Sequence, residues 1–354
     1  MEFNCKVNIV DAIMGAGKTQ SIMNYINQSN DKFLVITPFL DEITRYRTYC
    51  KSKNFKSPKF ENKKTKLDNI KYLVEKGENI VSTHALFQKF DNEKRLCDLG
   101  SLVCYGNDLM VWLFPIETFN SFRNIFILTY KFELQLQKYY YDYYGLQYQF
   151  WSVEGNDLEN YHLVTYEPNK SYLDYNYEQL IHICEIEKLN LIGDRDTDLS
   201  KSWYVRNKNN TSIKVLKNNI QNFFRNIRND NSSDNIWTTF KDYQSLLKGK
   251  GYTKGYLPLN SRATNEYRER TSVAYPVNRY LNPFVKNFFN SNNIEVDENG
   301  FALSEMLQFI WRSAIRDGKE IWVYIPSIRM RNLLKQWIKQ NSPQITTKTE
   351  NKHM

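Results

Sequence analysis

The chain has 354 residues and a formal net charge of +9, and 41% of its residues are hydrophobic. This length exceeds what one hydrophobic core usually supports, so two domains are expected, and the apolar content excludes a mostly disordered protein. The excess of lysine and arginine favours a polyanionic partner such as nucleic acid.

The sequence also limits the expected compartment. The N-terminus lacks a basic stretch followed by an apolar core, so no signal peptide is expected. The most apolar run, residues 109–114, is far too short to span a bilayer, which predicts no membrane association. Five cysteines without a C-x-x-C pair are typical of a reducing compartment. The expected location is therefore cytoplasmic.

The first predicted elements are a strand, a glycine-containing loop and a helix. Residues 5–10 alternate in polarity as a strand does, and residues 20–26 carry Ile22 and Ile26 one helical turn apart. Between them, residues 12–19 read Ala-Ile-Met-Gly-Ala-Gly-Lys-Thr, the A-x-x-G-x-G-K-T form of a phosphate-binding loop. Such a unit directs backbone N–H groups and the positive end of a helix dipole at an anion.

The chemistry of this loop needs these residue types in this order. The two glycines permit positive φ angles that turn N–H groups inward, while the lysine reaches terminal phosphates and the threonine hydroxyl binds Mg²⁺. A magnesium-bound nucleoside triphosphate is the expected ligand, and the alternative is a turn followed by a surface lysine. The expected contacts are Gly15, Ala16, Gly17, Lys18, Thr19 and Gln20, with Mg²⁺ bound by Thr19 through the nucleotide.

Further short apolar runs follow, and helix-compatible sequence separates them. They cover residues 33–38, 79–84 and 125–129. Apolar strands that alternate with helices predict an α/β fold in which a parallel sheet is covered by helices on both faces. In such sheets, ligand-binding groups gather at the carboxyl ends of the strands.

The middle of the chain differs in composition. Residues 139–144 are five tyrosines and one aspartate, and Asn-rich stretches follow at 207–210 and 229–235. The tyrosines could stack on bases, but aromatic residues along one helix more often fill a core or a domain interface, which we favour. A domain junction is expected in this region. The predicted domains are residues 1–185 and 186–340, with a flexible tail at 341–354.

The second half is expected to contain another set of strands and a helix. The predicted strands are residues 236–240, 255–259, 273–275 and 321–325. Between the last two strands, Leu303, Met306, Leu307 and Ile310 repeat at helical spacing. This block is therefore expected to form a second α/β domain.

These residues together resemble the superfamily 2 helicases and translocases, which consist of two RecA-like (P-loop NTPase) domains with ATP bound between them. Residues 12–19 resemble motif I of that superfamily, and Thr37 with Pro38 resembles motif Ia. Thr83 with His84 resembles the next element that contacts the nucleic-acid backbone, and residues 128–130 stand where motif III falls. The resemblance implies nucleic-acid contacts by Thr37, Pro38, Thr83 and His84.

The resemblance continues in the second half. Residues 260–265 are similar to motif V, which implies nucleic-acid contacts by Arg262, Thr264 and Asn265. Residues 308–316 are similar to motif VI, the Q-x-x-G-R-x-x-R helix, with Trp311 in place of its glycine and the second arginine one residue late. Arg312 and Arg316 would then share one helix face and reach a γ-phosphate bound by the opposite domain. Lys18, Arg312 and Arg316 are the expected catalytic residues, and the alternative is two arginines that solvate a helix.

One motif of the superfamily is missing. Motif II, an Asp-Glu pair at a strand end, holds the magnesium water shell and orients the attacking water. No Asp-Glu pair occurs between residues 84 and 128. Asp98, Asp108 and Glu117 are the candidate substitutes in that stretch, and loss of a segment that carries a central strand is the other explanation.

The resemblance implies an ATP-dependent helicase or translocase, and within the superfamily the block at residues 311–331 is most similar to bacteriophage-encoded helicases. ATP, Mg²⁺ and nucleic acid, DNA in preference to RNA, are the implied ligands, with replication or recombination proteins as partners and the host cytoplasm as location. The alternative is a degenerate helicase-like protein that binds nucleotide and nucleic acid or a protein partner with little turnover. A packaging motor is a further alternative, but such motors carry an acidic strand end.

Overall fold

The computed structural model describes residues 3–38, 40–60, 65–87, 102–105, 109–112, 119, 121–168, 170, 173, 175–259 and 266–342. The chain divides into two compact units, each with its own core. The N-terminal unit comprises Met1–Tyr172, Asn260–Asn265 and Tyr280–Ser304, and the C-terminal unit comprises Leu173–Leu259, Glu266–Arg279 and Glu305–Met354. That the chain consists of two domains with a boundary between residues 185 and 186 remains a prediction.

The main sheet of the N-terminal unit has its phosphate-loop strand in the middle. Its strand order is β6-β1-β7-β8, and β1 runs parallel to both of its neighbours, while β8 returns antiparallel to β7. The bounds are β1 (Val7–Asp11), β6 (Ile125–Thr129), β7 (Tyr148–Glu154) and β8 (His162–Thr165). The predicted strand at 125–129 is confirmed, and the parallel α/β character of the fold is confirmed with it.

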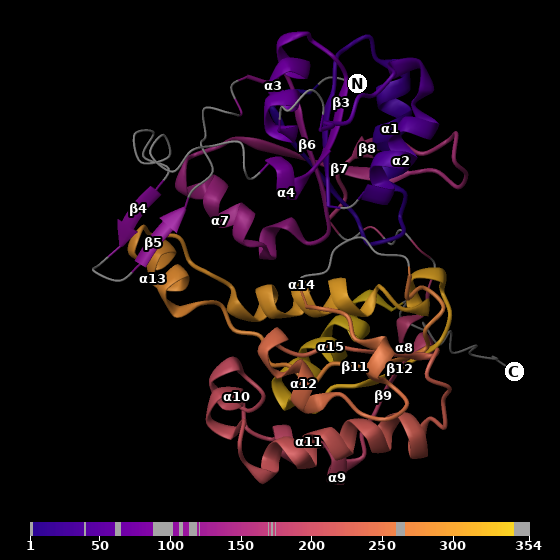
Figure 1. The fold of residues 1–354 in the computed structure, drawn as a ribbon, viewed down its shortest axis with the longest axis vertical. Helices are drawn as coiled ribbons and strands as arrows, with labels where there is room; N and C mark the ends of the chain where they lie inside the picture. The colour runs from indigo at the N-terminus through magenta and orange to yellow at the C-terminus, as the bar shows by residue number, and fades with distance from the viewer. Residues whose placement is uncertain are drawn as a thin grey trace, which may run out of the picture. The chain divides into compact units, whose positions relative to one another are not determined.

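Alternating side chains of this sheet face two different helices, α1 (Lys18–Gln28) and α7 (Leu136–Tyr143). Val7 and Ile9 pack with Tyr141 of α7 in one buried cluster. On the opposite face, the ring of Phe126 lies 5.3 Å from the ring of Tyr25 in α1. Figure 1 shows α1 and α7 on different sides of these strands. Both faces are therefore covered, which is why all five residues of β1 are buried.

A second pair of parallel strands, β2 (Leu34–Thr37) and β3 (Ile80–Thr83), lies in the same unit. The far side of β3 is covered by a bridge between Lys56 and Ile80. An ion pair of 2.9 Å joins Arg123, just before β6, to Asp31, just before β2. The helices that contact these strands are α2 (Leu40–Tyr49), α3 (Lys66–Glu75) and α4 (His84–Phe87). The antiparallel pair β4 (Leu102–Tyr105) and β5 (Leu109–Trp112) belongs to the same unit.

The tyrosine-rich helix α7 is a core element on two sides. Tyr141 belongs to the cluster beneath the main sheet, and Tyr139 packs with Phe288 and Phe289 of α13 (Pro283–Ser291). The hydroxyl of Tyr139 also accepts a hydrogen bond from the Asp297 N–H at 3.0 Å. Burial raises the pKa of Tyr139 and raises that of Tyr141 to about 12. The preference for a core role of the tyrosine tract is confirmed.

The C-terminal unit is built on an entirely parallel four-stranded sheet of order β10-β11-β12-β9. Its strands are β9 (Ile181–Ile183), β10 (Asn235–Trp237), β11 (Ser272–Ala274) and β12 (Ile321–Tyr324). Its helices are α8 (Tyr177–Leu180), α9 (Glu187–Asn190), α10 (Lys201–Asn207), α11 (Thr211–Asn222), α12 (Gln244–Leu247) and α15 (Ile328–Asn341). Figure 1 shows α11 and α9 along one side of these strands.

A large aromatic core fixes α11 on this sheet. Leu216 and Ile220 of α11 pack with Trp237 of β10 and Tyr324 of β12 in a fully buried cluster. Apolar residues at positions i, i+3 and i+7 of α11 produce the stripe that faces the strands. Burial of the Tyr324 hydroxyl costs little because it donates to the Leu189 carbonyl at 2.7 Å.

Two expectations for the second half are wrong. Residues 255–259 form no strand, and that stretch makes a single bridge between Trp237 and Tyr256. The helix predicted to carry both arginines, α14 (Glu298–Ile310), ends before them, and Ala314–Asp317 is a separate 3₁₀ turn. The helix stops because Ser313 donates its hydroxyl to the Ile310 carbonyl at 2.6 Å and Ala314 N–H turns away to the Arg270 carbonyl.

Candidate phosphate-binding site

The loop between β1 and α1 has the backbone form that anion binding requires. Gly15 and Gly17 have φ angles of 98° and 90°, in the left-handed region that favours glycine. Gly17 is the N-cap of α1, and no side chain caps that helix end. The first turn of α1 contains no acidic residue. Its N–H groups and the positive end of its dipole are therefore available to an anion.

Lys18 lies across the mouth of this loop. Its ammonium group donates to the carbonyl oxygen of Ala12 and, at 3.0 Å, to that of Ile13. Thr19 follows in the first turn and is half-buried. Gly15, Ala16 and Gly17 thus lie in the turn between β1 and α1, and Lys18 and Thr19 begin α1. Their contact with a nucleotide remains a prediction. A bound triphosphate would exchange the two carbonyl contacts of Lys18 for charge-assisted contacts with phosphate oxygens.

Asp11, at the carboxyl end of β1, is the described carboxylate next to the loop. Its two oxygens accept the N–H groups of Lys131 and Phe132 at 2.8 and 3.0 Å. Lys131 has a φ of 53°, so Asp11 holds a strained turn just after β6. Burial raises the pKa of Asp11, and these backbone bonds and the charge of Lys18 oppose that rise. Burial also lowers the pKa of Lys131. We assign Asp11 a structural role.

The end of β6, where motif III was expected, contacts the loop through the backbone. The Ala12 N–H donates to the Thr129 carbonyl at 3.1 Å. Gln135 donates its amide to the Thr129 hydroxyl at 2.6 Å and to the Tyr130 carbonyl at 2.8 Å. Thr129 is thus tied both to the loop and to the start of α7, which fixes the β6 side of the site.

The β7–β8 hairpin covers the other side of the loop, a contact that no sequence pattern predicts. Tyr161, just before β8, packs directly on Gly17, because a Cβ added to that glycine would lie 2.2 Å from Tyr161 Cε1. Gln20, expected to contact the nucleotide, is 3% exposed and donates to the Leu158 carbonyl of this hairpin at 3.0 Å. No residue near position 161 forms a motif, so only the fold reveals this contact.

The residues expected to contact nucleic acid fall into two groups. Thr37 and Thr83 are aligned partners at the carboxyl ends of β2 and β3, and the Thr37 hydroxyl donates to the Ser82 carbonyl at 3.4 Å. Pro38 and His84 follow these strand ends directly. The remaining expected contacts, Arg262, Thr264 and Asn265, lie outside the described residues. All nucleic-acid roles remain predictions.

The two arginines of the expected motif VI lie in the C-terminal unit. Arg312 is 9% exposed, and its Nε donates to the Gln308 carbonyl at 2.9 Å. Arg316 is half-buried in the 3₁₀ turn. They do not share a helix face, because α14 ends at Ile310. Since the loop belongs to the other unit, a meeting of these arginines with a bound nucleotide remains a prediction.

Metal binding was expected only through the nucleotide. Within the described parts of the chain, no three His, Cys, Asp or Glu side chains are grouped so as to hold a metal ion. The candidate acidic substitutes Asp98, Asp108 and Glu117 lie outside the described residues. The contact of Thr19 with nucleotide-bound Mg²⁺ remains a prediction.

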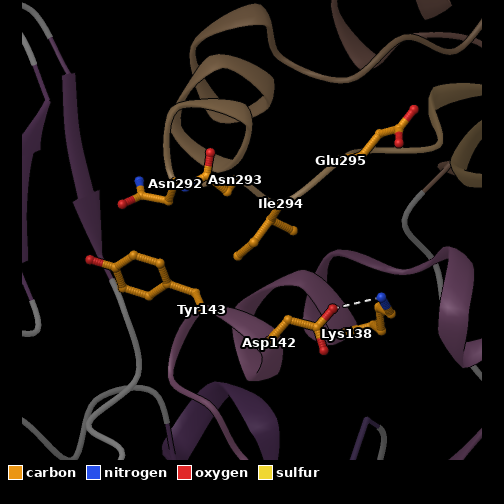
Figure 2. A pocket seen from close by; sticks show the side chains of 7 residues that line it. All are labelled: Lys138, Asp142, Tyr143, Asn292, Asn293, Ile294 and Glu295. Carbon is orange, nitrogen blue, oxygen red and sulfur yellow. Dashed lines mark ion pairs between the residues drawn. The ribbon is translucent and has the colours of Figure 1, made fainter.

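The recess drawn in Figure 2 belongs to a different part of the N-terminal unit. It lies between α7 and the segment after α13, and Lys138, Tyr143 and Ile294 line it. Lys138 is paired with Asp142 at 2.6 Å. The recess has no phosphate-loop residue in its wall, so we do not assign it to nucleotide binding.

Within the described ranges, every helix is too short or too polar to cross a bilayer.

Comparison with known proteins gives two matches. Residues 175–338 match the family described as the YonV C-terminal Rossmann-like domain. A relative in Bacillus subtilis (strain 168), described as SPbeta prophage-derived uncharacterized protein YonV, is 35% identical, and the match covers 94% of this chain and 98% of the relative. The match spans 409 positions whereas this chain has 354 residues, so at least 55 positions of the relative have no counterpart in this chain. The parallel sheet of the C-terminal unit agrees with the Rossmann-like description, and neither description names a helicase.

Proposed function

The chain belongs to the YonV family, and we propose that it is a phage-encoded protein that binds a magnesium-bound nucleoside triphosphate and uses it to act on nucleic acid, as helicases and translocases do. The observation that carries the proposal is the turn at residues 12–19. It combines two glycines of positive φ, an uncapped helix N-terminus and a lysine at its mouth. In this chemistry the backbone N–H groups bind the phosphates, Lys18 the terminal ones, and Thr19 the Mg²⁺.

The helicase part of the proposal draws on the order of the elements along the chain. Each unit contains parallel strands with helices between them, which is compatible with two RecA-like domains. The net charge of +9 favours contact with a phosphate backbone, and DNA is the partner that we propose first. Of the two arginines, Arg316 is the better candidate to contact a γ-phosphate, because Arg312 is nearly buried and bonded to Gln308.

The experiment measures nucleotide binding and turnover on the full chain. We expect ATP with Mg²⁺ to bind, and Lys18→Ala to weaken binding by roughly 10- to 100-fold, the effect of one charge-assisted contact. Lys188→Ala, on an exposed position of α9, removes the same charge and should leave binding unchanged. The proposal further predicts multiple-turnover ATP hydrolysis that single-stranded DNA stimulates. Equal binding by the Lys18→Ala variant and the wild type would refute the site.

A second candidate is a protein that binds nucleotide and nucleic acid without sustained turnover. Among the described strands, β6 pairs only with β1, and β2 pairs only with β3. No described strand therefore joins the β6 edge of the main sheet to the β2 edge of the smaller sheet. Their starting ends are nevertheless joined by Arg123 and Asp31. An acidic strand end is what hydrolysis needs, and Asp11 is a poor substitute because both of its oxygens accept backbone N–H groups.

The same turnover assay separates the two candidates. Tight ATP binding with no more than a single turnover, with or without DNA, supports the second candidate and rejects the helicase. Sustained turnover that DNA stimulates rejects the second candidate. If turnover occurs, replacement of Arg316 by Ala should abolish it while ATP binding persists, because an arginine of this kind acts on the transition state.

A further inference from the structure

The loop of the β7–β8 hairpin, residues 155–161, is fixed to helix α1 by buried amide groups. Asn24 is 8% exposed, and its Nδ2 donates to the carbonyl oxygens of Leu158, Glu159 and Tyr161 at 3.0, 3.2 and 2.8 Å. Gln20 adds a bond to the Leu158 carbonyl, and so does the Tyr49 hydroxyl at 3.1 Å. Although residues 154–160 are exposed to solvent, their backbone is therefore held in one position beside the phosphate loop.

The side chain that this arrangement delivers to the loop is Tyr161. A Cβ on Gly17 would lie 2.2 and 2.3 Å from Cε1 and Cδ1 of its ring, so the edge of the ring rests on the loop backbone. Gly155 packs against the backbone of the same residue, since its added Cβ would meet Tyr161 Cα at 2.5 Å and N at 2.7 Å. Tyr161 itself remains half-exposed. An aromatic ring that is held beside the loop and remains partly exposed offers a surface to a ligand.

The orientation of a bound triphosphate follows from the positions of Lys18 and Tyr161. The Lys18 ammonium interacts with Asp11, whose carboxylate is bonded to the turn after β6. Tyr161 comes from the hairpin that follows β7, and β6 and β7 flank β1 on opposite sides. Because the lysine of such a loop contacts the terminal phosphates, the nucleoside end of the ligand lies on the β7 side, where the ring is.

We propose that Tyr161 is the platform on which the base of the nucleotide stacks. This inference rests on the proposed nucleotide site and adds to it the residue that recognises the nucleoside. Every base has a π-face, so a ring that stacks without reading base edges binds all of them. The chain should therefore show similar affinities for ATP, GTP and CTP.

The test compares a nucleotide with a ligand that has no base. Binding of ATP and of inorganic tripolyphosphate, each with Mg²⁺, is measured by calorimetry on the full chain. Tyr161→Ala should weaken ATP binding roughly tenfold, the usual effect of losing one stacked ring, and leave tripolyphosphate binding unchanged. Tyr161→Phe should retain wild-type affinity for both ligands. Tyr72→Ala, an exposed tyrosine of α3, is the matched control and should alter neither.

A second variant protects the test against misfolding. Tyr161→Leu keeps an apolar side chain on Gly17 but removes the π-face, so it should weaken ATP selectively, as Tyr161→Ala does. Equal ATP affinity in wild type, Tyr161→Ala and Tyr161→Leu would overturn the platform. Tighter binding of both ligands in Tyr161→Ala would also overturn it, because the ring would then be an obstacle. If the wild type binds tripolyphosphate as tightly as it binds nucleotides, the stacking role of Tyr161 is rejected and the phosphate site stands. If the wild type binds neither tripolyphosphate nor nucleotides, the proposed function is rejected as well.

Discussion

The turns after β1 and after β12 have the same topology and opposite chemistry. Each leads from the carboxyl end of a parallel strand into a long helix, α1 in the N-terminal unit and α15 in the C-terminal unit. The turn before α1 contains glycines of positive φ and leaves the helix N-terminus uncapped. The turn before α15 reads Ile-Pro-Ser, and Ser327 caps its helix by accepting the Met330 N–H.

Protein groups already fill the second turn. Arg331 is 7% exposed, and its Nη1 donates to the carbonyl oxygens of Ile325 and Pro326 at 2.8 and 2.9 Å. Gly193 packs on the same turn, since a Cβ there would lie 2.3 Å from the Pro326 oxygen. The difference shows that a parallel strand followed by a helix does not by itself make an anion site. The helix that follows the turn must also begin without a side-chain cap, as α1 does.

The largest effect is expected from a substitution in the turn between β1 and α1, whose helix end is uncapped. Gly17→Ala forces a Cβ into the Tyr161 ring at a φ of 90°, and we expect it to lower the free energy of unfolding by about 3 kcal/mol and to abolish nucleotide binding. Gly77→Ala is the matched control, because Gly77 also has a positive φ, of 62°, but its added Cβ meets nothing within 4 Å. The control should lose only about 1 kcal/mol. Urea denaturation measures both, and equal losses would contradict the contact with Tyr161.

The next largest effect is expected at the turn between β12 and α15, whose carbonyl groups Arg331 binds. Arg331→Ala leaves the Ile325 and Pro326 carbonyls without their buried donor, and we expect a loss of about 2 kcal/mol in the free energy of unfolding. Nucleotide affinity should not change, because this arginine supports the C-terminal core rather than the phosphate loop. Arg206→Ala, at an exposed position of α10, should stay within about 0.5 kcal/mol of the wild type. A loss of nucleotide binding in the Arg331→Ala variant would mean that the two turns are not independent.

The smallest effect is expected from a change in the contacts that hold the β7–β8 hairpin beside the turn between β1 and α1. Asn24→Ala removes the amide that holds three hairpin carbonyls, and we expect it to cost about 1.5 kcal/mol of stability. Because Tyr161 is then less well held, ATP binding should weaken more than tripolyphosphate binding. Gln28→Ala, at the exposed last residue of α1, should change neither quantity. If tripolyphosphate affinity fell as much as ATP affinity, Asn24 would be supporting the loop itself and not the ring.

Local patterns predicted much of the N-terminal unit. The strands at 34–37, 80–83 and 125–129, the loop at 12–19 and the helix from Lys18 lie where alternation, helical spacing and the glycine pattern put them. Those features depend on neighbours within a few residues along the chain, so the sequence contains the information directly. The prediction that one helix carries Arg312 and Arg316 was wrong for a nonlocal reason, because the Ala314 N–H donates to the carbonyl of Arg270, 44 residues earlier.

The sequence by itself determined the glycine-containing turn between β1 and α1, the α/β class and the core role of the tyrosines. Only the tertiary structure decided that Tyr161, 144 residues after Gly17, rests on that glycine, and that Arg331 closes the corresponding turn of the other unit. Backbone preferences and hydrophobic periods act over one or two turns of chain, whereas these contacts exist only after β7 pairs with β1 and β12 with its neighbours. A turn's shape is local, but what fills or covers it depends on which distant strands the sheet brings together.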